Sequence, residues 1–182
     1  MRSLTAAFAL SALMLTAANA ADFTVKSETF KNGAVMPKSV EFIGFGCDGG
    51  NQSPQLSWSG APAGTKSFVI TQHDPDAPTT VGWWHWTVYN IPATVNALPA
   101  GASKSAALPK GALEGLTDYG TTGFGGACPP KGDKPHRYNT TVYALSVEKF
   151  DMPAETMTGA KLMFLIKDVT LGKATITGLY GR

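Results

Sequence analysis

The sequence has few charged residues and no run of basic ones. Asp, Glu, Lys and Arg make up 15% of its 182 residues, and the formal net charge is +2. A near-neutral chain without a basic cluster lacks the long-range attraction on which nucleic-acid binding depends. We therefore expect no nucleic-acid partner.

Long apolar runs are also scarce. The one substantial run, Leu4–Leu15, follows the positive Arg2 and precedes Ala18–Ala20, which places small residues where signal peptidase reads them. The run is too short to span a bilayer, and this order is typical of a secretory signal peptide, with a buried N-terminal helix as the alternative. We expect residues 1–20 to be a signal peptide and 21–182 a single domain. The expected location is periplasmic or secreted, with no membrane span.

Cysteine occurs only twice, at Cys47 and Cys128. In a secreted chain an even count favours a disulfide, with two free thiols as the alternative. No CxxC pair is present, and no histidine stands at ligand spacing from either cysteine. We therefore expect no metal site at these residues and no cofactor.

The 20 glycines and 12 prolines separate short β-prone runs, and long amphipathic helices are few. This pattern is typical of a β-sandwich or barrel. Strands are predicted at 67–72, 84–91, 139–147 and 173–180, with a further β-prone run at 39–45. One helix is predicted over 156–169. Residues 93–118 have the weakest strand signals and are interpreted as a long surface excursion.

Polar residues gather in a turn directly after the first strong strand, in the segment His73–Pro78. Its prolines fix the backbone and restrict the residues before them, so Asp74 and Asp76 can be aimed at a ligand or a neighbouring loop. Alternatively, both carboxylates cap backbone amides of a strand-end turn.

The second unusual segment is Trp83–Trp86, at the start of the next strand. Because side chains alternate along a strand, His85 is predicted to lie on the face opposite Trp84 and Trp86. A histidine alone on one face is either a ligand-binding residue or a satisfied core residue, and this segment alone favours the second.

The third segment is a glycine-rich loop over 123–132, followed by His136 and Tyr138. Glycines allow a close approach of the backbone, and successive amides in such a turn can form an anion-binding nest. The alternative is an irregular loop held by Cys128.

Together these segments resemble signature blocks of the phosphatidylethanolamine-binding protein family. The blocks are DPDAP at 74–78, WWHWTVYNIP at 83–92 and GACPPKG with PHRY at 126–138. GFGCDGGNQSPQLSW at 44–58 and the final ITGLYGR are similar to its bacterial Raf kinase inhibitor-like branch. The likeness extends over the whole chain after residue 20.

The resemblance implies a mostly β, sandwich-like fold with a few short helices and one pocket for phosphate-like groups. By motif match, the ligand-binding residues are Asp74, Trp83, His85, Gly126, Pro129, Pro130, His136 and Tyr138. Two features depart from eukaryotic members. Cys128 replaces the glycine before the paired prolines, and no C-terminal helix is evident to cover the pocket.

The function expected from these residues is binding of a small anionic ligand or phosphorylated group. The anion would lie between His85 and His136, accept hydrogen bonds from imidazole and loop N–H groups, and have Asp74 orient one histidine. The alternative is a protein partner, as in a protease inhibitor or signalling modulator, with 93–118 as the contact surface. No GxSxG nucleophile motif accompanies the histidines, so we expect no enzyme. A His/His/Asp metal site is conceivable, but the sequence does not give its geometry.

Overall fold

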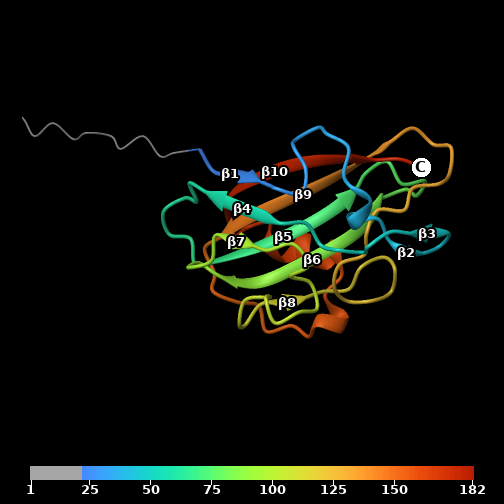
Figure 1. Cartoon of the computed structure of the whole chain (residues 1–182). Helices are drawn as coiled ribbons and strands as arrows, with labels where there is room; N and C mark the ends of the chain where they lie inside the picture. The colour runs from blue at the N-terminus through green and yellow to red at the C-terminus, as the bar shows by residue number, and fades with distance from the viewer. Residues whose placement is uncertain (1–21) are drawn as a thin grey trace, which may run out of the picture.

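The computed structural model describes residues 22–182, so the predicted signal peptide at 1–20 lies outside the described residues. A five-stranded antiparallel sheet with the strand order β10-β9-β5-β6-β8 forms the centre of the molecule (Figure 1). Its strands are β5 (Ser67–Asp74), β6 (Trp83–Pro92), β8 (Leu113–Glu114), β9 (His136–Leu145) and β10 (Thr170–Tyr180). Among the described residues, no helix is both long and apolar enough to cross a membrane.

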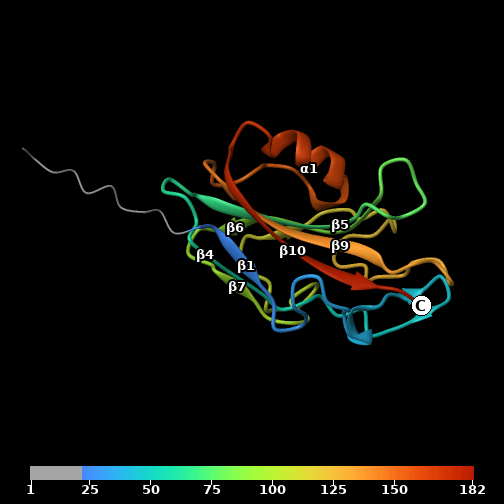
Figure 2. The same ribbon diagram turned by 90° about the horizontal axis from the view of Figure 1, so that it is seen from above.

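Two smaller layers cover the faces of this sheet (Figure 2). On one side lies a three-stranded sheet of β1 (Thr24–Lys26), β4 (Leu56–Ser59) and β7 (Ala97–Leu98). The other side carries α1 (Gly159–Ile166), whose first turn is capped by the Thr158 side chain, which accepts from the Lys161 amide. A separate hairpin joins β2 (Ile43–Gly44) to β3 (Cys47–Asp48), and two 3-10 turns, η1 (Lys38–Val40) and η2 (Ala154–Thr156), complete the elements.

Apolar side chains fill both spaces between the layers. On β5, Phe68 and Ile70 belong to the cluster that faces the small sheet, whereas Val69 belongs to the cluster beneath α1. Alternate side chains on a strand point to opposite faces, so a strand between two layers needs apolar residues in both phases. The same two-phase pattern occurs on β9, with Val142 in the first cluster and Leu145 in the second.

The mostly β, sandwich-like class and the four strong strands are confirmed, each within a few residues. The β-prone run at 39–45 does not form one strand. Pro37 precedes the 3-10 turn η1, and only Ile43–Gly44 then pair as the short β2. The predicted helix over 156–169 is shorter than expected. Within 93–118 the chain forms only β7, β8 and turns.

One end of the central sheet collects the polar segments. The last residue of β5 is Asp74, and its antiparallel neighbours β6 and β9 begin there with Trp83 and His136. The β2–β3 hairpin and the last residue, Arg182, lie at the same end (Figure 1). This end holds the candidate site.

Candidate functional site

A cavity of about 220 Å³ opens at this end of the sheet. Seven of the eight ligand-binding residues predicted from the sequence line it, and Gly126 does not. Its lining residues are Phe45, Asp74, Ala77, Pro78, Thr79, Trp83, His85, Tyr119, Cys128, Pro129, Pro130, His136 and Tyr138. None of these lining residues is Lys or Arg, so the described part of the chain places no fixed positive charge in the lining.

A buried carboxylate–imidazole pair forms one part of the wall. His136 Nδ1 donates to Asp74 Oδ2 at 2.8 Å, and both side chains are only 3% exposed. The other carboxylate oxygen of Asp74 accepts from the backbone amides of Asp76 at 2.8 Å and Ala77 at 3.1 Å. Asp74 therefore combines both sequence-based alternatives: it caps the turn after β5 and orients His136.

His85 is fixed in one tautomer by the backbone opposite it. Its Nδ1 lies 2.8 Å from the Gly125 carbonyl and 3.1 Å from the Gly126 carbonyl. Carbonyl oxygens only accept, so Nδ1 carries the ring proton. Burial lowers the pKa of His85 to about 4, which keeps the ring neutral at neutral pH. His85 Nε2 is therefore a hydrogen-bond acceptor, and it is buried without a partner among the described residues.

This geometry corrects the predicted role of His85. A neutral ring with its proton on Nδ1 has no N–H to offer an anion from Nε2. The donors nearest to the site are instead Tyr138 and Trp83, whose hydroxyl and indole nitrogen are also buried without partners among residues 22–182. Burial and the nearby charge of Asp74 raise the pKa of Tyr138, so its phenol stays protonated and able to donate.

The predicted alternation of the Trp83–Trp86 segment was wrong at His85. Trp84 pairs with His73 and Trp86 with Gln72, so His85 is the extra residue of a β-bulge. As a result Trp84 packs against Gly159 of α1, whereas Trp86 joins the core on the other face. A bulge bends the strand and re-aims side chains, which explains why His85 faces the cavity.

The glycine-rich loop does not form the predicted anion nest. The amides of Gly125, Gly126 and Ala127 donate to His85 O, Asn51 Oδ1 and Val40 O, respectively, within the protein. A Cβ on Gly126 would lie 2.2 Å from the Val40 carbonyl, so a glycine is needed for contact with the neighbouring backbone. Gly126 stands behind the wall and contacts His85 through its carbonyl.

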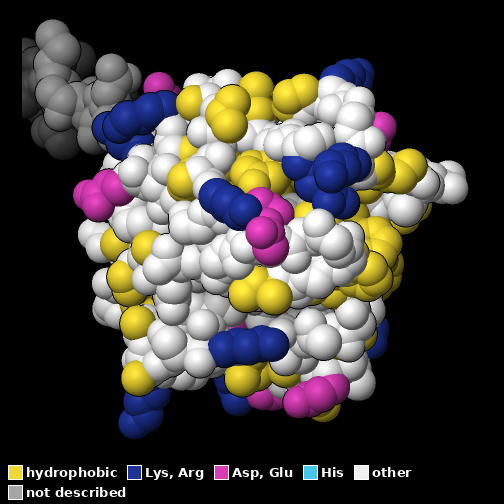
Figure 3. Space-filling model, turned by 45° about the vertical axis from the view of Figure 1, so that its right-hand side comes forward, with side chains coloured by type: hydrophobic (Ala, Val, Ile, Leu, Met, Phe, Trp, Pro, Cys, Tyr) yellow, Lys and Arg dark blue, Asp and Glu magenta, His cyan; other side chains and the backbone are white. Residues whose placement is uncertain are grey.

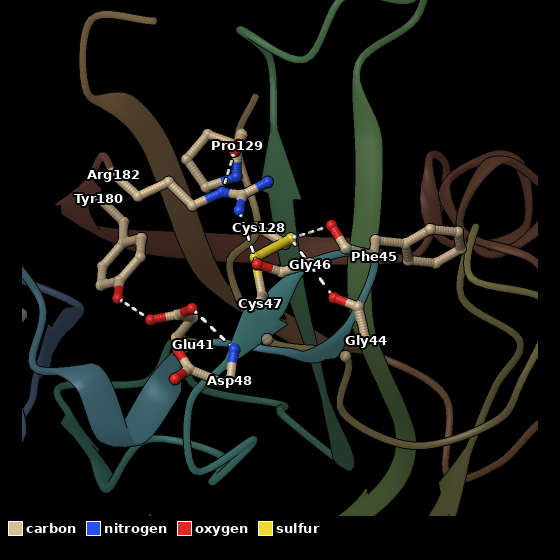
Figure 4. The surroundings of a disulfide bond; sticks show 12 residues. Glu41, Gly44, Phe45, Gly46, Cys47, Asp48, Cys128, Pro129, Tyr180 and Arg182 are labelled. Carbon is tan, nitrogen blue, oxygen red and sulfur yellow. Dashed lines mark hydrogen bonds between the residues drawn. A yellow bond between two sulfur atoms is a disulfide. The ribbon is translucent and has the colours of Figure 1, made fainter. Parts of the chain in front are cut away.

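The predicted disulfide is confirmed, and it ties the cavity wall to the β2–β3 hairpin (Figure 4). Cys47 of β3 is bonded to Cys128, which precedes Pro129. Arg182 adds a second tie, since its guanidinium donates to Pro129 O at 2.7 Å and Gly46 O at 2.8 Å. Tyr180, two residues earlier, donates to the buried carboxylate of Glu41. The C-terminal residues thus hold the wall and the hairpin in place.

Sequence reasoning missed two aromatic residues of the site, Phe45 and Tyr119. Phe45 is 76% exposed and adopts a left-handed backbone with φ of 52° at the tip of the hairpin. Its ring centroid lies 5.8 Å from that of Tyr119. The flanking Gly44 and Gly46 were a signal of a tight turn that presents this side chain.

Hydrophobic and basic side chains are interspersed on this side of the molecule, and no histidine among the described residues is visible there (Figure 3).

Within residues 22–182, no group of three or more His, Cys, Asp or Glu side chains is arranged to hold a metal ion. Around the cavity, the basic Arg137 is engaged by Asp76 through Nη2 and Oδ1 at 2.7 Å. The titratable groups of the lining are thus two buried imidazoles, one carboxylate and two tyrosine phenols.

Comparison with known proteins gives consistent matches. The family model described as phosphatidylethanolamine-binding protein matches residues 26–181. The UPF0098 protein YbcL of Escherichia coli is 52% identical over 165 residues, which is 90% of each chain. YbhB of the same organism is 47% identical over 155 residues, 85% of this chain and 97% of its own. The crystal structure of E. coli YbcL matches with a TM-score of 0.86 and 51% identity, covering 89% of this chain and 99% of that one.

Proposed function

The chain belongs to the phosphatidylethanolamine-binding protein family, and we propose that it is a periplasmic or secreted binding protein whose cavity holds a small anionic, phosphate-like group. The observation that carries this proposal is the set of unpartnered polar atoms in the lining residues. Tyr138 Oη and Trp83 Nε1 supply donors, and His85 Nε2 supplies an acceptor. Buried polar atoms are rarely left without partners, so a ligand that completes their hydrogen bonds is the natural occupant.

The shape of the cavity fits a small polar group attached to a larger body. About 220 Å³ is more than a single phosphate group needs, and Phe45 at the mouth offers an apolar surface to whatever the group is attached to. Most small-molecule sites are apolar clefts with a few well-placed polar atoms. This is the composition of the cavity here.

We also propose the extracytoplasmic location and the division into a signal peptide at 1–20 and one domain at 21–182. The disulfide supports this location, because such bonds persist in oxidising compartments and are rare in the bacterial cytosol. Fractionation with mass spectrometry tests it. The expected species is an oxidised chain that begins at Ala21 outside the cytoplasm, and an unprocessed cytoplasmic chain contradicts it.

We further propose that the site binds rather than catalyses. The lining supplies no free thiol, because Cys128 is oxidised, and the proton-carrying nitrogens of His85 and His136 both face acceptors of the protein itself. The pair of Asp74 and His136 then serves to shape and orient the wall.

Titration of inorganic phosphate followed by NMR of the histidine rings tests the anion proposal. The chain has three histidines, and His73 lies outside the cavity lining, with its Nε2 bonded to the Val81 carbonyl. We expect ring signals of His85 and His136 to shift in a saturable manner while those of His73 change little. Saturable shifts confined to His73, or no shifts at all, would refute the proposal.

A further inference from the structure

The hydrogen-bonding state of His85 sets a condition on the ligand beyond its negative charge. Its only proton in the neutral ring is held on Nδ1 by two carbonyls, at 2.8 and 3.1 Å. Nε2 then presents a lone pair, and no described residue donates to it. A ligand oxygen without a proton would meet this lone pair with its own, and the contact would be repulsive.

Other features of the wall point the same way. The Asp74 carboxylate lines the cavity, and no Lys or Arg side chain does. The guanidinium of Arg137 is paired with Asp76, and that of Arg182 donates to two carbonyls of the wall and hairpin. A ligand of high negative charge would therefore find a carboxylate nearby and, among the lining residues that the structure describes, no cation to balance it. An anion that carries its own proton avoids both problems.

We propose that the cavity selects phosphate groups that can carry a proton, namely phosphomonoesters or free phosphate, over phosphodiesters and sulfate, because His85 Nε2 accepts a hydrogen bond from the ligand's P–OH. This inference rests on the proposed anion-binding function and specifies its ligand class. The remaining oxygens of the group would accept from donors such as Tyr138 and Trp83. One ligand then pairs an acceptor and two donors that the protein leaves unpaired.

The size of the selectivity follows from where the shared proton comes from. A diester or sulfate has no proton to give at pH 7, so its binding would require His85 itself to be protonated, with a pKa of about 4. A monoester has a second pKa of about 6, so its protonated form is far more accessible. The difference of about two pH units corresponds to an affinity ratio of about 100-fold.

Several titratable groups lie around His85. They are His73 and Asp74 from β5, His136 and Tyr138 from β9, and Tyr119 from the segment between β8 and β9. Tyr119 and Tyr138 stay protonated, since burial raises the pKa of each phenol.

Calorimetric titration of the oxidised protein with matched ligand pairs at pH 7 tests the proposal. Methyl phosphate and dimethyl phosphate differ by one methyl group, and phosphate and sulfate are nearly isosteric. We expect methyl phosphate and phosphate to bind about 100-fold more tightly than dimethyl phosphate and sulfate. Monoester affinity should fall as the pH rises above about 6, and binding at pH 7 should take up protons, as measured in buffers of different ionisation enthalpy.

Two outcomes overturn the inference in different ways. If dimethyl phosphate and sulfate bind as tightly as their partners, the selectivity is wrong while the proposed anion-binding function stands. If none of the four ligands binds, both fail. His85→Phe removes the acceptor and should reduce the 100-fold ratio to below about tenfold, whereas His73→Phe, outside the cavity, should preserve it. An unchanged ratio in a folded His85→Phe protein would overturn the role of His85 and assign the selectivity to another group.

Discussion

Removal of the disulfide should destabilise the protein mainly through the unfolded state. Cys47 and Cys128 are separated by 81 positions in the sequence. In the chain-entropy model, a loop of this length restricts the unfolded chain by about 4.5 kcal/mol at 25 °C. In the native state Arg182 also links the two bridged segments, since it donates to Pro129 O and Gly46 O. These segments should therefore stay in contact when the disulfide is absent. We therefore expect a C47S/C128S double variant that folds but is less stable.

The expected loss corresponds to a fall in Tm of roughly 9–18 °C for a domain of this size. Urea unfolding of the oxidised protein, the reduced protein and the double variant measures it. The m-value should rise when the bridge is absent, because the unfolded chain then exposes more surface. Reductant should not affect the double variant, which serves as the control. A loss below about 1 kcal/mol with an unchanged m-value would refute the unfolded-state argument.

Two further predictions concern buried and surface carboxylates. Glu114 accepts from Trp86 Nε1 at 2.7 Å and from the Lys104 amide at 2.8 Å, so Glu114→Ala should cost about 2–4 kcal/mol in urea unfolding, and Glu114→Gln less. Equal stability of all three proteins would contradict this. The Arg137 guanidinium lowers the pKa of Asp76, so their pair stabilises the fold above the unfolded pKa of about 3.9 and loses this effect as the pH falls. Asp76→Asn should therefore lower the free energy of unfolding by about 1 kcal/mol at neutral pH. Unfolding measured across pH should show this difference between the two proteins narrowing below pH 4. A difference in unfolding free energy that stays constant with pH would contradict the role of the ion pair.

The strong strands could be predicted because their physical signal is local. Ser67–Asp74 and His136–Leu145 carry apolar residues in both phases, and this requires only that each strand be covered on two faces. The run at 39–45 misled because its β-prone residues stand between Pro37 and the Gly44–Gly46 turn, and the backbone of that turn has positive φ at each position. Turn geometry decided the outcome there, and side-chain propensity did not.

Most site residues could be named from the sequence, but their chemistry could not. The ring nitrogen of His85 that carries the proton is determined by the Gly125 and Gly126 carbonyls, about forty residues away. A bulge that depends on strand pairing with Gln72 and His73 gives His85 its orientation. Neither fact leaves a pattern in the segment Trp83–Trp86 itself, and so the alternation rule failed there.

The topology of the central sheet explains why these distant segments meet. β5 lies between β6 and β9 and runs antiparallel to both, so the end of β5 adjoins the starts of its two neighbours. Asp74, Trp83 and His136 therefore occupy one edge, although β9 begins 62 positions after Asp74. The middle of each of these strands is covered on both faces by the other layers. The polar residues lie at the strand ends, where the covering layers stop. The same arrangement that stabilises the core thus leaves a cavity at this edge, and the disulfide fixes its remaining wall.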